Sequence, residues 1–523
     1  MSKVGANRHS QFRGKATAAA KTRYKVVHID ENGNSNGGNG NGNGDGNGSG
    51  NCNVKGNGNG KVNGNGLLCY SYVYGNGNSN VNDNSSGKQN RNVNGNRNHS
   101  GNGNSNGGNA NNNDNGNGDG NRNNNSALPC SIDIRRDLPM SNQSQPLYLK
   151  PKSSEYWHPN TEGYLQVPHG RCIELVCTGP FANVTVENGT QSLNLEPHIR
   201  TICPRCLRGT TFLLNDGQYE FRHFVCAQKV KYTVERTTQG CANNTAETYR
   251  IGYNLTDGRF VQTLLACYDI AQIRTHYTEF VLDSANARFQ TGVKRSRFSK
   301  VGYFKMDMNY LYSQKNQHAQ AAKVHGSTEI AMTYFDSKLK YLSRGHLTAK
   351  ADKIYATEQQ TTFNFFNVAA QWQPFNGVSW AKMEDKMRQY LAENQRTATC
   401  YSGTYGTMHF TRASDNMSVP FFLAQDENNN DVIAVPQQFY RICTVGSNVG
   451  LAILGVNNIH ATLDEIVKYL LCDDVSEQVP WLSWIKNEQL LEYGYLYACR
   501  VSELVKMVPE LPAHLSGITE LLI

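Results

Sequence analysis

The sequence predicts an α+β protein in which a small β-rich module precedes a larger domain of mixed helices and strands. Three observations support this prediction. An Asn/Gly-rich stretch fills much of the first 127 residues, alternating strand-like runs come after it, and helical runs join the strand-like ones after about residue 270. We therefore divide the chain into an arm at 1–127, a β-rich module at 128–269 and a main domain at 270–523.

The arm is expected to be disordered. Asn and Gly dominate residues 32–126, and branched apolar residues are scarce there. Such a composition cannot bury enough apolar surface to offset the entropy lost on ordering. Residues 1–27 are basic and lack the apolar core of a signal peptide, so a mitochondrial or nuclear location stays open. Throughout the chain, apolar runs are far shorter than the roughly 20 residues of a membrane span.

Short antiparallel strands are expected in the module. Residues 173–175 and 184–186 alternate apolar and polar side chains, Asn188 and Gly189 form a tight-turn signal, and residues 231–235 give a further strand. Twelve of the 14 cysteines of the chain lie between Cys130 and Cys499. This even number indicates disulfides and favours a secreted protein. The alternative for the Cys203 and Cys206 pair is a zinc site, although a second closely spaced Cys or His pair is absent.

The main domain contains strand-like residues 279–282 and helical residues 380–393 and 463–471. Within it, residues 341–347 resemble the end of a strand that turns through Gly345 and presents Arg344 and His346. A single histidine is more often structural than catalytic, so His346 gains weight only from the residues downstream of it.

A set of polar residues with helical spacing lies downstream of His346. Asn376, Trp380, Glu384 and Arg388 recur at every fourth position and would lie along one side of a helix. The amide oxygen of Asn376, together with water and phosphate oxygens, suits a hard cation such as Mg²⁺. Glu384 would orient water on the metal and Arg388 would contact a phosphate. The alternative is a helix N-cap followed by an ordinary surface ion pair.

Positive charge gathers around this region. The formal net charge is +8, and residues 294–300 form a basic cluster followed by Tyr303 and Phe304. Basic and aromatic side chains together suit phosphate contact and base stacking, although a solvated loop has the same composition. The charge indicates a polyanionic partner and is weak support when taken alone.

These residues resemble the DNA/RNA non-specific endonucleases with a ββα-metal, or His-Me finger, core. Arg344, Gly345 and His346 resemble the family's Asp-Arg-Gly-His motif, with Ser343 in place of the aspartate. The downstream family pattern is matched by Asn367, Gln371, Asn376, Trp380, Glu384 and Arg388. The chain looks closest to the arthropod duplex-specific and double-stranded-RNA-degrading nucleases, over about residues 146–523.

The resemblance implies a Mg²⁺-dependent endonuclease, with Mn²⁺ as a substitute, that cuts DNA and RNA with little sequence preference and leaves 5′-phosphates. His346 would be the general base, and Asn376 the metal ligand. The implied catalytic residues also include Arg344, Asn367, Glu384, Arg388 and a phosphate-clamping arginine, which is Arg295 or Arg297. The alternative is a catalytically inactive nucleic-acid-binding homologue. DNA and RNA are the expected partners, no membrane contact is expected, and the sequence leaves a homodimer open.

Overall fold

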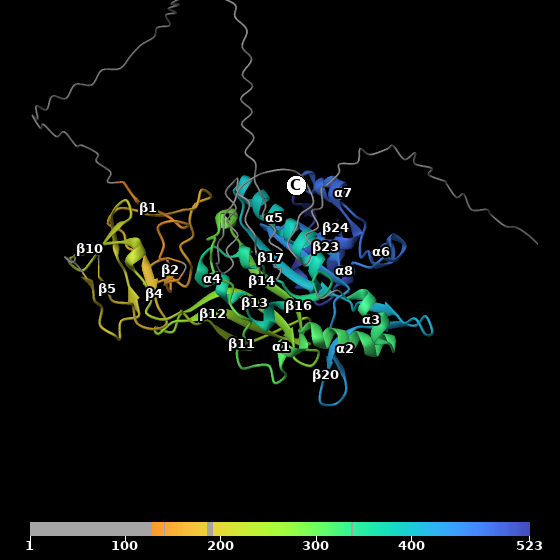
Figure 1. The fold of residues 1–523 in the computed structure, drawn as a ribbon. Coiled ribbons are helices and arrows are strands. Elements are labelled where there is room, and N and C mark those ends of the chain that lie inside the picture. The colour runs from red at the N-terminus through yellow and green to blue at the C-terminus, as the bar shows by residue number, and fades with distance from the viewer. Residues whose placement is uncertain (1–127, 141, 186–191, 336–337) are drawn as a thin grey trace, which may run out of the picture. The chain divides into compact units, whose positions relative to one another are not determined.

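The computed structural model describes residues 128–523 except for 141, 186–191 and 336–337 (Figure 1). The predicted disordered arm and the predicted turn at Asn188 lie outside the described residues. All the described residues belong to one contact unit, Gly118–Ile523.

The N-terminal module consists of small antiparallel sheets, as predicted. Its strands are β1 (Cys130–Asp133) with β3 (Tyr164–Val167), β2 (Leu147–Leu149) with β4 (Glu174–Val176) and β7 (Thr201–Ile202), β5 (Val184–Thr185) with β6 (Ser192–Leu193), and β8 (Arg205–Arg208) with β9 (Thr211–Leu214) and β10 (Gly217–Glu220). None of these sheets exceeds three strands, but their buried side chains, such as Tyr148, Leu175 and Phe221, share one hydrophobic core. Small domains of this kind commonly depend on disulfides as well.

Six disulfides among the described residues confirm the prediction made from the cysteine count. Three lie within the module and three in the main domain and its sheet. They are Cys130–Cys206, Cys172–Cys203, Cys177–Cys226, Cys241–Cys267, Cys400–Cys443 and Cys472–Cys499. Cys203 and Cys206 therefore bond to different partners, which excludes the alternative in which these two thiolates share a zinc ion.

A nine-stranded sheet forms the centre of the main domain (Figure 1). Its order is β11 (Thr233–Cys241), β12 (Ala246–Asn254), β13 (Phe260–Asp269), β14 (Arg274–Leu282), β17 (Ala398–Tyr405), β22 (Gln438–Val445), β23 (Val449–Val456) and β24 (Tyr495–Cys499), with β25 (Glu520–Leu521) beside β23. The sheet crosses the division predicted at residue 270, because β13 and β14 pair directly. The hydrogen bonding favours a division before β11, near residue 232.

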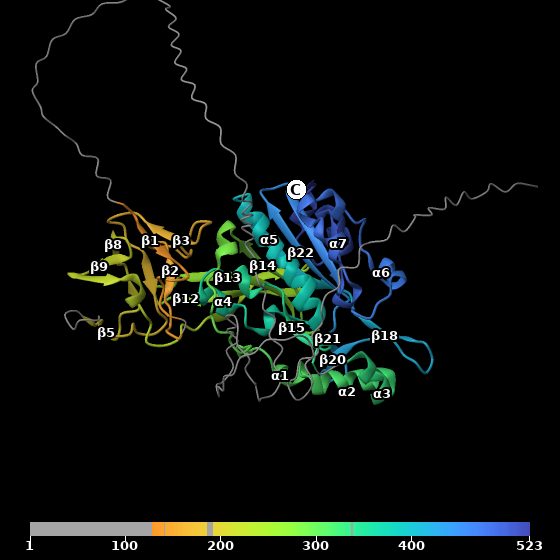
Figure 2. The same ribbon diagram turned by 45° about the horizontal axis from the view of Figure 1, so that its top comes forward.

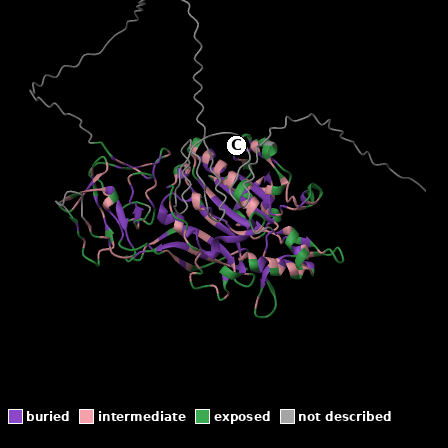
Figure 3. Ribbon diagram, viewed as in Figure 1, coloured by how far each residue is buried: buried purple, intermediate pink, exposed green. Residues whose placement is uncertain are grey.

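Both faces of this sheet are covered. On β23, Leu451 and Ile453 belong to one hydrophobic core, whereas the alternating Ala452 and Leu454 belong to another. This period of two is expected for a strand that is buried on both sides, and the central strands are indeed buried (Figure 3). The first core contains α5 (Ala381–Glu393), which crosses the sheet (Figure 2), and the second contains α8 (Val501–Met507).

The remaining elements surround the sheet. They are α1 (Met308–Leu311), α2 (Gln314–His325), α3 (Thr328–Tyr334), β15 (Leu342–His346), α4 (Ala356–Thr361), β16 (Val368–Trp372), β18 (His409–Thr411), β19 (Ser418–Pro420), β20 (Phe422–Gln425), β21 (Asp431–Ala434), α6 (Leu463–Tyr469) and α7 (Trp484–Glu488). The helices predicted at 380–393 and 463–471 correspond to α5 and α6, within a residue or two. Of the helices in the described part of the chain, none is long and apolar enough to cross a bilayer.

His158 joins the module to the main domain through two carboxylates. Its ring nitrogens lie 3.3 Å from Glu358 and 3.6 Å from Asp283. Burial disfavours the charged imidazolium, but the two carboxylates outweigh burial and raise the pKa of His158 to about 9. His158 is therefore charged at neutral pH and forms an ion pair between the two parts.

We expect this contact to weaken at high pH. The folded-state pKa lies above the ordinary value of about 6.5, so the stabilisation is fully present below pH 6.5 and is lost as pH rises through about 9. Thermal melts of the wild type and His158→Gln should differ at pH 7 by at most about 3 kcal/mol, and should converge by pH 10. A difference that does not change with pH would contradict the ion pair.

Candidate active site

A β-hairpin and the helix after it carry most of the predicted site residues. β15 pairs antiparallel with β16, so that Ser343 lies opposite Gln371 and His346 lies opposite Val368. After Pro374 the chain enters a π-helical turn, Phe375–Trp380, and continues as α5. This strand-strand-helix unit carries both His346 and Asn376.

Gly345 has a different role from the one predicted. It lies within β15 opposite Ala369, not at a turn. A Cβ atom at this position would come within 2.4 Å of the Gln371 amide oxygen and 2.6 Å of the Gln371 Cβ. Glycine is therefore required because the Gln371 side chain lies directly over the backbone.

His346 lies between two phenylalanine rings. Its ring centroid is 5.1 Å from that of Phe298 and 5.0 Å from that of Phe363. Nε2 is buried and has no hydrogen-bond partner among the described residues. Burial, and after it the positive charge of Arg295, lowers the pKa of His346 to about 3. The imidazole is thus neutral at physiological pH and can accept a proton.

The side chain of Asn376 is oriented by Ser343. The Asn376 amide nitrogen donates to the Ser343 hydroxyl at 3.0 Å, and that hydroxyl donates to the Gln371 carbonyl at 2.9 Å. No hydrogen bond to the amide oxygen of Asn376 is found within the described part of the chain. Ser343, where many family members have aspartate, therefore has a clear structural role.

The residues present fit a hydrated divalent cation. Gln371 is fully buried, yet neither atom of its amide has a partner among the described residues. The free amide oxygen of Asn376 is linked to this residue through Ser343. Nowhere in the described ranges do three His, Cys, Asp or Glu side chains form a candidate metal site. A metal here would rest on amide oxygens and water, which suits Mg²⁺ better than zinc.

Two arginines flank His346. Arg344 donates to the Asn309 carbonyl at 3.1 Å, and its guanidinium lies 5.7 Å from the centre of the Phe298 ring. Arg295 is exposed, and its guanidinium lies 5.3 Å from the centre of the Phe363 ring, which in turn contacts His346. Arg297 has no comparable contact among the described residues, so the geometry favours Arg295 as the phosphate clamp.

Asn367 acts on the backbone beside His346. It is fully buried, accepts from the Thr348 amide at 2.7 Å, and donates to the carbonyls of Thr348 and Thr362, each at 2.9 Å. These bonds connect Thr348, two residues after His346, to the residue before β16. They make Asn367 a positioning residue for the loop after His346, whereas the resemblance implied a catalytic one.

Glu384 and Arg388 belong to a buried charge network that also contains two residues missed by sequence reasoning. Asp352 is bonded to Arg388 at 2.7 Å and to Arg441 at 2.9 Å, and Arg441 lies 3.4 Å from Glu384. The guanidinium of Arg388 faces this network, and the residue is only 5% exposed. Its contacts therefore favour an internal ion pair over the predicted phosphate contact. The one sequence feature that could have indicated this network is Arg441, a charged residue inside the otherwise mostly apolar strand β22.

The two carboxylates of the network have opposite pKa shifts. Burial raises the pKa of Glu384 to about 7, although Arg441 acts against this shift. Burial also opposes ionisation of Asp352, but Arg441 and Arg388 outweigh it and keep the pKa of Asp352 below its ordinary value. Both carboxylates contact Arg441, but Asp352 also pairs with Arg388 and therefore carries the negative charge more readily than Glu384.

Comparisons with known proteins identify the family of the chain. Residues 244–504 match the model of the DNA/RNA non-specific endonuclease family. The chain belongs to this family. It is 24% identical over 370 residues to a salivary endonuclease of Lutzomyia longipalpis, across 70% of this chain and 80% of the relative. A solved structure of an EndoG/EndoGI complex covers 50% of this chain and 89% of its own at 15% identity, but its TM-score of 0.30 is too low to indicate a shared fold.

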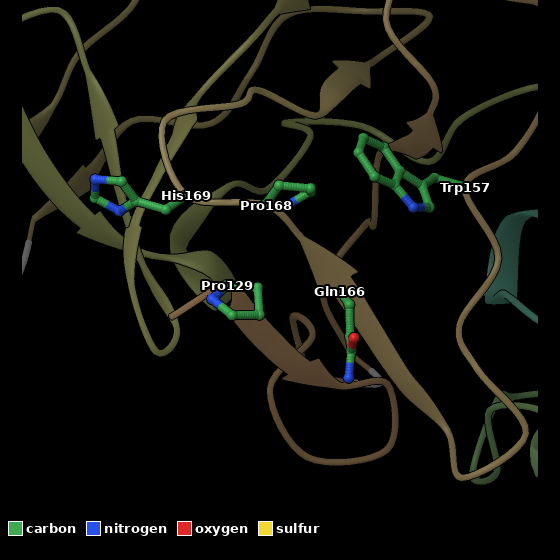
Figure 4. Close-up of a pocket in the computed structure, with 5 residues that line it drawn as sticks. All are labelled: Pro129, Trp157, Gln166, Pro168 and His169. Carbon is green, nitrogen blue, oxygen red and sulfur yellow. The ribbon is translucent and has the colours of Figure 1, made fainter. Parts of the chain in front are cut away.

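This nuclease also has a pocket that is separate from the predicted site. It measures about 400 Å³ and lies in the module, lined by Pro129, Trp157, Gln166, Pro168 and His169 (Figure 4). No charged group of the kind that would hold a phosphate lines it, and a ring nitrogen of His169 already bonds the Leu207 carbonyl at 2.8 Å. The pocket therefore lacks the chemistry expected of a phosphodiester site.

Removal of the Asp352 charge should strongly destabilise the nuclease. Asp352→Asn would leave Arg388 and Arg441 buried without their main counter-charge, so we expect the free energy of unfolding to fall by about 3–5 kcal/mol. Urea denaturation would measure this loss. The matched control is Asp385→Asn, because Asp385 lies 3.6 Å from Arg388 but its side chain is 45% exposed. The control should cost less than about 1 kcal/mol, and equal losses in both variants would refute the network.

Proposed function

We propose that this nuclease is a metal-dependent endonuclease that cuts duplex DNA and RNA with little sequence preference and leaves 5′-phosphates. His346 is the general base, and Asn376 holds the metal, Mg²⁺ with Mn²⁺ as a substitute. The observation that carries the proposal is the hairpin-helix unit. It carries, on β15, a neutral imidazole with a free Nε2 and, just before α5, an asparagine whose amide oxygen is free among the described residues. Metal dependence is typical of the family.

The side chains divide the work between proton transfer and phosphate contact. His346 accepts a proton at Nε2 from the attacking water, since this nitrogen has no partner among the described residues. Arg295 and Arg344 orient the phosphate, because their guanidinium groups lie against the aromatic rings around His346. When bound, the metal neutralises charge that develops on the phosphate and its leaving oxygen. Glu384 orients water through its partly exposed carboxylate.

The same contacts account for the weak sequence preference. Arginine and lysine side chains recognise phosphate and sugar, which carry no base sequence. Preference for a duplex would then result from the shape of the helix and the spacing of its phosphates. The disulfides favour an oxidising, extracellular setting.

His346→Ala should lower kcat by about 100- to 10,000-fold, because the variant lacks its proton acceptor. Nicking of supercoiled plasmid with Mg²⁺, with and without a chelator, measures the effect. His409→Ala is the matched control, since this histidine is exposed on β18. Turnover retained by His346→Ala would refute its role as base. If the wild type binds plasmid but never nicks it, the chain is an inactive nucleic-acid-binding homologue instead.

Ser343→Ala should weaken metal binding by about 10- to 100-fold, as expected when a residue that orients a ligand is lost. Without the hydroxyl, the Asn376 amide can rotate away. Calorimetric titration with Mn²⁺ measures the affinity independently of turnover. Asn376→Ala should abolish the binding, whereas Asn376→Asp, which retains an oxygen ligand, should preserve it. Equal affinity in the wild type and Asn376→Ala would exclude Asn376 as the ligand.

A further inference from the structure

A long segment connects the two strands of the active-site hairpin. This crossover segment runs over residues 347–367, between His346 and the start of β16. Two of its residues, Ile354 and Tyr355, belong to the hydrophobic core that is built mainly by the β-rich module and that also includes Tyr253 of β12 and Val261 of β13. The middle of a loop that begins and ends in the active site is therefore anchored in the module.

Tyr355 forms the centre of this anchor. It is fully buried, and its ring centroid lies 4.9 Å from that of Tyr148 and 5.9 Å from that of Tyr156. Its hydroxyl donates to the Trp157 carbonyl at 2.5 Å. One side chain of the crossover segment thus contacts three residues of the module, through both packing and a hydrogen bond.

The contacts continue into α4, directly after Tyr355. The Tyr156 hydroxyl donates to the Thr357 hydroxyl at 3.1 Å, and His158 pairs with Glu358 at 3.3 Å. The other oxygen of Glu358 accepts from the Tyr355 amide at 3.0 Å and so caps the helix. Side chains of the module therefore hold the first turn of α4 together with two from the main domain, since Tyr253 donates to the Thr357 carbonyl at 2.8 Å and Gln290 accepts from the Ala356 amide at 2.9 Å.

Directly after α4, the chain places Phe363 against the ring of His346. The Phe363 amide donates to the Gln360 carbonyl at 3.2 Å, and the Phe363 ring packs edge-on against the imidazole of His346. At the adjacent residue, the Thr362 carbonyl accepts from Asn367, which also fixes the loop after His346. Little more than the length of α4 separates the anchor at Tyr355 from the ring that contacts the base.

We propose that the β-rich module is a positioning element of the active site, which acts through Tyr355 and α4 to fix Phe363 and thereby the ring of His346. The proposal rests on the function proposed above for His346. Its physical basis is that a long segment between two short strands is ordered only by its contacts. Lys353 and Thr361 are bonded to Thr263 of the main domain, and Tyr355 between them is held by the module. A base held slightly out of line loses most of its efficiency.

The test uses the full-length chain and two substitutions at one position. Tyr355→Ala removes the ring from the module core, and Tyr355→Phe removes only the bond to Trp157. We expect kcat to fall by about 10- to 100-fold for Tyr355→Ala and less for Tyr355→Phe. KM for duplex DNA should stay within about twofold, because neither side chain lies on a substrate surface. Assays are run well below the melting midpoint of each variant.

A matched control separates positioning from general destabilisation. Phe212 is also fully buried in the module, where it packs on Phe221 at 4.9 Å, but its ring does not stack on any ring of the crossover segment. Phe212→Ala should lower the melting temperature while its kcat remains that of the wild type. Restored turnover in Tyr355→Phe relative to Tyr355→Ala provides a second, conservative comparison.

The pH profile of kcat gives a readout that partial unfolding cannot imitate. A fraction of unfolded molecules lowers kcat equally at every pH and leaves the shape of the profile unchanged. A loosened Phe363 would instead admit water to His346 and relieve the burial that lowers its pKa. The acidic limb should then move up by about one pH unit or more in Tyr355→Ala, toward the ordinary histidine pKa, and should not move in Phe212→Ala. Arg295, Lys350 and Asp352, the charged groups that act on His346, are unchanged in both variants.

Three results would overturn the proposal. Wild-type kcat in Tyr355→Ala would show that the anchor is dispensable, and equal losses in Tyr355→Ala and Phe212→Ala would reduce the module to a stabilising part. A rise in KM with kcat unchanged would make the module a substrate-binding part instead. If His346→Ala retains turnover, the proposed function fails whatever the Tyr355 variants show, so the two failures are distinguishable.

Discussion

The antiparallel pairing of β15 with β16 determines where Ser343, Arg344 and His346 point. The two strands form a sheet of their own, separate from the nine-stranded sheet, and an isolated two-stranded ribbon is only marginally stable in water. Buried amide side chains satisfy its outer edges. Gln317 bonds both backbone groups of Leu342, and Asn457 bonds the Trp372 amide and the Ala370 carbonyl. A slip of one residue would leave these amides unpaired and would turn each side chain to the opposite face.

The electrostatics of the site depend on where its carboxylates lie. Asp352 is fully buried and paired with Arg388 and Arg441, so little negative charge faces the substrate side. Burial and Arg295 act in the same direction on His346 and keep it neutral in the free protein. A bound phosphodiester would bring negative charge beside this imidazole and would raise its pKa toward the range useful for proton transfer. If His346 is the base, as proposed, the substrate itself would improve it.

The sequence predicted local features well and long-range pairings poorly. The spacing of Asn376, Glu384 and Arg388 predicted a helix. α5 confirms it for Glu384 and Arg388, because that pattern depends only on neighbours along the chain, whereas Asn376 lies in the π-helical turn before α5. The π-helical turn before α5 has no such signal. Asp352 and Arg441 are distant in the sequence, and only the pairing of β22 within the sheet brings them together. The division at 270 was misplaced for the same reason, since β11 to β13 look like module strands until their partners are known.

The role of the module illustrates this limit most clearly. Short hairpin loops impose their own conformation, but β15 and β16 are joined by the crossover segment, which is too long to do so. Order must then come from packing, and Ile354 and Tyr355 supply it by entering a core closed by three disulfides. A core that is itself held by disulfides yields less to thermal motion than loops packed only on each other. Part of the order of the proposed site thus comes from a region that contributes none of the predicted site residues.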